Sequence, residues 1–91
     1  MPIYSNQFTI GTATAIQIVA PDVEEQEAWI HDDEHSQSTK LYIGNAQVSP
    51  TTGLHLGSDE TVKLNIPPND TVYAISTGGN VNVHVMRVTQ H

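Results

Sequence analysis

The chain has 91 residues, with ten acids against three bases for a formal net charge of −7, and it contains no cysteine. This length predicts one hydrophobic core, and the lack of cysteine excludes disulfides, thiolate metal sites and thiol nucleophiles. The acidic balance disfavours nucleic acid and anionic membranes as direct partners, and no apolar run approaches the roughly 18 residues of a membrane span. We expect a soluble single domain over residues 1–91, with its β-sandwich over residues 8–89.

The N-terminal segment is more apolar than a free terminus requires. Residues 1–7 predict an arm that either frays or reaches a neighbouring subunit, since Ile3, Tyr4 and Phe8 would be wasted in solvent. The first strand of the domain is expected near residues 7–10.

Residues 13–19 and 26–31 alternate apolar and polar side chains, which indicates half-buried strands. A helix over residues 22–30 is the alternative, because an acidic stretch after Pro21 is typical of a helix start. Trp29 is out of phase with its apolar neighbours, so one face of this strand exposes apolar surface unless a partner covers it.

Seven of the ten acids lie between Asp22 and Glu34, and we expect them on one edge or end of the domain. Such a concentration is typical of a solvated surface that protects strand edges from stray pairing. The alternative is electrostatic matching to a basic patch on a partner.

The same stretch contains several residue types that bind metals. The spacing fits neither a calcium loop nor a zinc site on rigid elements, so a polar hairpin tip leading to the next strand is the simpler interpretation. The candidate metal ligands are His31, Asp32, Asp33 and His35.

The middle of the chain predicts one clear strand and one long connection. In residues 39–43, Leu41 and Ile43 share one face, and Tyr42 lies on the other. Residues 46–56 predict a connection that contains one or two short strands.

Residues 60–66, 71–76 and 81–88 predict three strands joined by tight turns, which would form a meander. Together, about seven short antiparallel strands predict an all-β fold, a single small β-sandwich or barrel with Greek-key or jelly-roll connections. The side chains expected to face the interior are Val62, Leu64, Ile66, Tyr73, Ile75, Val81, Val83 and Val85.

The sequence contains no motif that indicates catalysis. It lacks a nucleophile elbow, a phosphate-binding glycine loop and a dinucleotide fingerprint, so we expect no catalytic residue, no cofactor and no enzyme activity. The large side chains that are candidates for a protein interface are Ile3, Tyr4, Phe8, Trp29, Tyr42 and Met86.

Three segments carry a resemblance: Leu41-Tyr42-Ile43-Gly44, Val48-Ser49-Pro50-Thr51-Thr52-Gly53-Leu54-His55-Leu56 and Thr71-Val72-Tyr73-Ala74-Ile75-Ser76. The chain resembles, from about Thr12 to Val88, small β-domains encoded among the structural genes of tailed bacteriophages. The acidic residues 24–34 depart from the neutral polar residues expected in that class.

The resemblance implies a virion protein, specifically a capsid decoration (cement) protein on the capsid exterior, made in the host cytoplasm. Its implied partners are the major capsid protein, which it would stabilise, and itself, as a homotrimer. The alternative is a carbohydrate- or receptor-binding module of a head fibre or tail, in which Trp29 or Tyr42 would be an exposed stacking platform.

Overall fold

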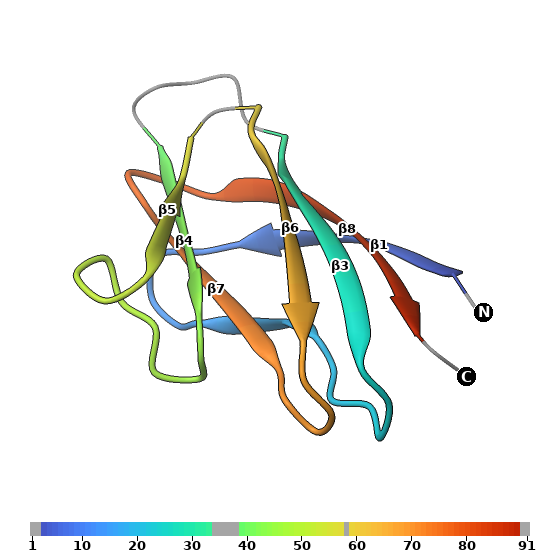
Figure 1. Ribbon diagram of the computed structural model, residues 1–91. Coiled ribbons are helices and arrows are strands. Elements are labelled where there is room, and N and C mark those ends of the chain that lie inside the picture. The colour runs from blue at the N-terminus through green and yellow to red at the C-terminus, as the bar shows by residue number, and fades with distance from the viewer. Residues whose placement is uncertain (1–2, 34–38, 58, 90–91) are drawn as a thin grey trace.

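The structure, a computed structural model, describes residues 3–33, 39–57 and 59–89, which form eight strands and no helix (Figure 1). No segment within these residues could therefore cross a membrane as a helix. The strands are β1 (Ile3–Ile10), β2 (Ile16–Val19), β3 (Gln26–Asp32), β4 (Lys40–Gly44), β5 (Leu54–Leu56), β6 (Thr61–Ile66), β7 (Val72–Thr77) and β8 (Val81–Thr89).

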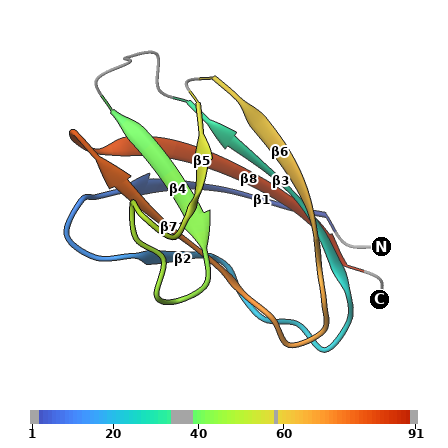
Figure 2. The ribbon, with the colours of Figure 1, turned by 60° about the vertical axis from the view of Figure 1, so that its left-hand side comes forward.

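The strands form two antiparallel sheets that pack face to face (Figure 2). Sheet A has the order β1-β8-β3-β6 and sheet B has the order β2-β7-β4-β5. The first strand pairs with the last, the second with the seventh, the third with the sixth and the fourth with the fifth, which is the nesting of a jelly roll. The predicted all-β sandwich is confirmed, with eight strands in place of about seven.

The core lies between the two sheets and is built by alternate residues of each strand. In sheet A, Val81, Val83 and Val85 are buried as expected, and Ile66 is buried at the end of β6. Val62 and Leu64 pack against the core but stay partly exposed, because β6 is an edge strand. Burial of each such side chain contributes about 1.5–3 kcal/mol to folding, before entropy costs.

The inward face expected for β7 is wrong. Val72, Ala74 and Ser76 face the interior, whereas Tyr73 is half-buried and Ile75 is 9% exposed on the opposite face. Four consecutive apolar residues occupy the start of this strand, so alternation alone does not say which pair points inward.

The predicted C-terminal meander is also wrong. β6 and β8 both lie in sheet A, but β7 lies between them in sequence and belongs to sheet B. The connection after β6 crosses from one sheet to the other, with Asn69 in the left-handed region (φ 65°) and its N–H donating to Asp22 O at 2.7 Å. A tight turn does not by itself require that the strands it joins be paired.

Two expectations around the acidic stretch are corrected. The alternative helix over residues 22–30 is wrong, because residues from Gln26 onward form β3. The expected hairpin after His31 is also wrong, because β3 and β4 belong to different sheets. The described acids of this stretch are divided between the two ends of β3, since seven extended residues span roughly 23 Å, and Glu34 lies outside the described residues.

The N-terminal arm expected over residues 1–7 is, from Ile3 onward, the first half of an ordinary strand. All eight residues of β1 pair with β8, from Ile3 opposite Val88 to Ile10 opposite Val81. This register places the two ends of the described chain side by side at one end of sheet A (Figure 1).

Candidate functional site

The outer face of sheet A, which points away from the core, carries two rows of side chains that run across all four strands. Directly paired residues of antiparallel strands point to the same face, so the register defines each row. One row is Gln7, His84, His31 and Thr61, and the next is Ser5, Met86, Trp29 and Lys63.

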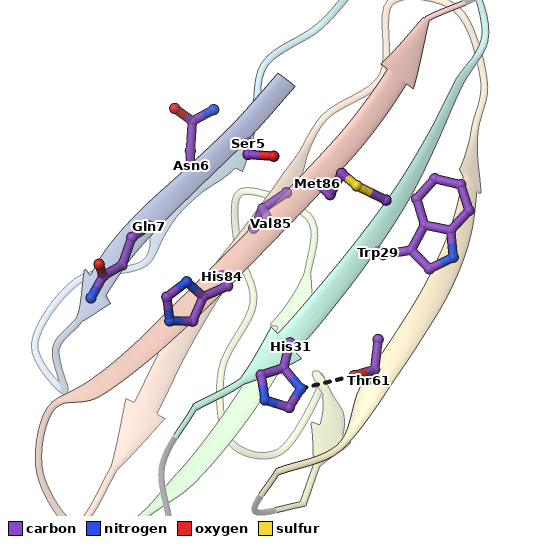
Figure 3. Close-up of a pocket in the computed structure, with 9 residues that line it drawn as sticks. All are labelled: Ser5, Asn6, Gln7, Trp29, His31, Thr61, His84, Val85 and Met86. Atoms are coloured by element: carbon purple, nitrogen blue, oxygen red, sulfur yellow. Dashed lines mark hydrogen bonds between the residues drawn. The ribbon is translucent and has the colours of Figure 1, made fainter. Parts of the chain in front are cut away.

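All of these residues except Lys63 line an open depression of about 450 Å³, whose lining side chains are drawn in Figure 3. Met86 has 40% of its surface exposed, and Trp29 is half-buried beside it. The ammonium group of Lys63 lies 5.6 Å from the centre of the Trp29 ring and 3.5 Å from the Glu27 carboxylate. The depression therefore combines large apolar side chains with polar ones, a mixture that protein-binding surfaces also contain.

β1 is the edge strand beside this depression, and its outer edge has no neighbouring strand among the described residues. Its eight residues include no charge and no proline, and Ile3 is 66% exposed. The opposite edge, β6, carries Lys63, and the edges of sheet B are only four and three residues long. Charge and short length are the usual protections of an edge strand, and β1 has neither.

Tyr4 and Phe8 lie on β1 but point to its other face. Phe8 packs against the core. Tyr4 is 42% exposed, and the guanidinium of Arg87 lies 4.4 Å from the centre of its ring. Arg87 also donates from Nη1 to Gln26 Oε1 at 2.8 Å, so it joins the exposed aromatic ring to the buried end of β3.

Tyr42 lies on the opposite side of the molecule, on the outer face of sheet B. Its ring is half-buried and tilted against the His55 ring, with centroids 5.3 Å apart. Trp29 and Tyr42 are thus half-buried on different faces, so a stacking platform built on either ring would be only partly exposed. Of the six interface candidates, Ile3, Trp29 and Met86 share the outer face of sheet A.

The described candidate metal ligands do not all lie on the same face of sheet A. His31 and Asp33 lie on the outer face of sheet A, whereas Asp32 is 1% exposed on the inner face; His35 lies outside the described residues. Sequence analysis did not identify Asp59, whose carboxylate lies within 4.8 Å of the ligand atoms of His31 and Asp33. Asp59 is distant in sequence, and only the pairing of β3 with β6 brings it near.

No protein-family model and no curated protein sequence matches this chain. The fold is similar to a solved structure of Bacillus endospore appendages, described as a family of disulfide-linked pili, with a TM-score of 0.53. The match covers 98% of this chain and 89% of the other at 15% identity, which shows a shared fold. The chain is therefore a small all-β protein similar in fold to a pilus appendage protein.

Proposed function

We propose that this protein is a structural subunit that acts by binding other protein subunits, without catalysis of its own. The observation that carries the proposal is the free edge of β1, eight residues long and uncharged, beside the exposed side chains of Ile3 and Met86. Backbone groups along such an edge pair readily with a strand of another chain, and the adjacent apolar face adds buried area.

The structural similarity supports the same class of function. The similar structure is described as belonging to disulfide-linked pili, and this chain has no cysteine with which to form such a link. Association of this protein would therefore use contacts other than disulfides. A chain of 91 residues gains stability from such contacts, because a small domain buries a modest fraction of its surface.

The finer proposal is that the assembly is a virion and that the protein decorates the capsid exterior, with the major capsid protein as its partner. The resemblance of residues 41–44, 48–56 and 71–76 to phage structural domains supports it. Copies that span neighbouring capsid subunits would oppose opening of the lattice, because each must be released before the subunits separate.

The edge of β1 is tested by adding charge to it. Ser5→Lys places an ammonium group on β1, and we expect it to reduce self-association by at least tenfold, measured as mass against concentration by analytical ultracentrifugation. Asn65→Lys is the matched control, because it makes a similar exchange on β6, the opposite edge of the same sheet. Equal association of Ser5→Lys and the unmodified protein would contradict the use of this edge.

Binding to the capsid is tested separately, by mixing the purified protein with undecorated phage heads. We expect saturable binding at symmetric positions, visible by cryo-electron microscopy, and loss of binding in the double variant Ile3→Ser, Met86→Ser. Val23→Ser is the matched control, because Val23 is 71% exposed but lies in the connection between β2 and β3. If the protein self-associates but does not bind to heads, the proposal of capsid decoration is contradicted, whereas the proposal of a structural subunit is not.

A further inference from the structure

Two imidazoles and two carboxylates converge at one end of the depression on sheet A. Donor atoms of His31, Asp33 and Asp59 all lie within 4.8 Å of one another. His84 joins them, with its Nε2 atom 3.1 Å from Asp33 Oδ2. All four side chains are at least partly exposed, so an ion from solvent can reach them.

The fold builds this cluster from three separate segments. His31 and His84 are directly opposite in the pairing of β3 with β8, and Asp33 follows His31 by two residues, which keeps it on the same face. Asp59 comes from the turn before β6, where its φ of 58° lies in the left-handed region. The pairing of Thr61 with His31 brings that turn to the end of β3.

Thr61 also orients the imidazole of His31. Its Oγ1 atom lies 2.8 Å from His31 Nδ1. Figure 3 marks this hydrogen bond with a dashed line. When Nδ1 donates to this hydroxyl, the lone pair is on Nε2, the atom that lies 4.0 Å from Asp59 Oδ1. A histidine whose second nitrogen is fixed by a hydrogen bond is the usual arrangement at protein metal sites.

The charge of the cluster favours a cation. Two carboxylates lie close together in a chain of net charge −7, which has only three basic side chains. A divalent ion between the carboxylates would remove their repulsion.

We propose that His31, Asp33, Asp59 and His84 bind one divalent transition-metal ion of the Zn²⁺ class. Mixed imidazole and carboxylate donors suit zinc, whereas calcium and magnesium prefer oxygen donors alone. Tetrahedral zinc separates its ligand atoms by roughly 3.4 Å. Two separations here, 3.1 Å between His84 and Asp33 and 4.0 Å between His31 and Asp59, are near this value. The ligand atoms of His31, Asp33 and Asp59 lie within 4.8 Å of one another, and rotation of the exposed side chains, His84 included, would bring all four ligand atoms around one ion.

The ion would join the end of β3, the turn before β6 and the middle of β8, and so stabilise the folded state alone. The site does not depend on the proposed assembly, since all four ligands come from one chain.

The test is a titration of the purified full chain, made without a histidine tag, with ZnCl₂ followed by calorimetry. We expect one ion per chain, and a rise in Tm on the order of 10 °C at a hundredfold excess over Kd. His31→Ala and Asp59→Asn should each weaken zinc binding at least tenfold. Asparagine tolerates the left-handed region, so Asp59→Asn keeps the turn while removing the charge.

His55→Ala is the matched control, because His55 is exposed on the outer face of sheet B, far from the cluster, and zinc affinity should not change. The proposal is overturned if His31→Ala and Asp59→Asn bind zinc like the unmodified chain, or if His35→Ala alone abolishes binding. Displacement of zinc by equimolar calcium would also overturn it. A cobalt-loaded chain should show the visible absorption of a tetrahedral nitrogen–oxygen site, and an octahedral spectrum would contradict that geometry.

Discussion

The outer faces of the two sheets differ in how far other residues of the chain cover them. The outer face of sheet B is partly covered, over β4, by its own connection, residues 45–53, in which Val48 is 6% exposed and lies against Gly44. No described residue covers the outer face of sheet A in this way, and Met86 and Ile3 are 40% and 66% exposed. This difference in exposed apolar surface supports the proposal that other subunits bind to sheet A.

The cover on sheet B depends on close packing of backbone against side chain. Gly53 lies over Tyr42, and a Cβ atom added to Gly53 would be 2.7 Å from the Cβ of Tyr42 and 2.7 Å from Cγ2 of Val48. Only glycine allows this approach, since real Cβ contacts are not so short. Residues 45–53 thus pack against sheet B as part of the folded domain.

The largest effect on folding is expected from Gly53→Ala. The added methyl group should force residues 45–53 away from sheet B and lower the free energy of unfolding by about 1–3 kcal/mol, measured by urea unfolding. Gly11→Ala is the matched control, because the nearest atom to its added Cβ is 3.6 Å away, an ordinary contact. Equal stability of the two variants would show that sheet B is not closely covered.

A smaller effect is expected from Val48→Ala, which keeps the connection but removes its buried side chain. Loss of the two γ-methyl groups should lower the free energy of unfolding by about 1.5 kcal/mol. Val23→Ala removes the same atoms from a residue that is 71% exposed, and its urea midpoint should match that of the unmodified protein.

The smallest effect is expected from Met86→Ala on the bare face of sheet A. Because this side chain is 40% exposed, we expect the free energy of unfolding to change by no more than about 0.5 kcal/mol. A cost as large as that of Val48→Ala, in dilute monomeric protein, would mean that Met86 serves folding more than binding.

Much of the secondary structure could be predicted because alternation is a local property of an extended backbone. Leu41 and Ile43 share the buried face of β4, as expected, and Tyr42 lies on the other. The same alternation gave the correct phase for Val81, Val83 and Val85. It failed for Tyr73 and Ile75, where apolar residues occupy both faces of the strand.

The candidate site was predicted only in part, for the same reason. Trp29 and Met86 could be identified as apolar side chains out of phase with their strands, but their placement in adjacent positions depends on the register of β3 with β8. His31 and Asp33 were visible as metal-binding residue types, whereas Asp59 gave no signal in the sequence. Its place beside them follows from the pairing of β3 with β6.

The sequence by itself therefore determined where the strands lie and, in most of them, which side chains are buried, because both follow from the two-residue repeat of the pleated chain. The tertiary structure decided which strands share a sheet, which outer face stays bare and which distant residues meet. Those features depend on pairing between strands far apart in sequence, and local alternation contains no information about that pairing.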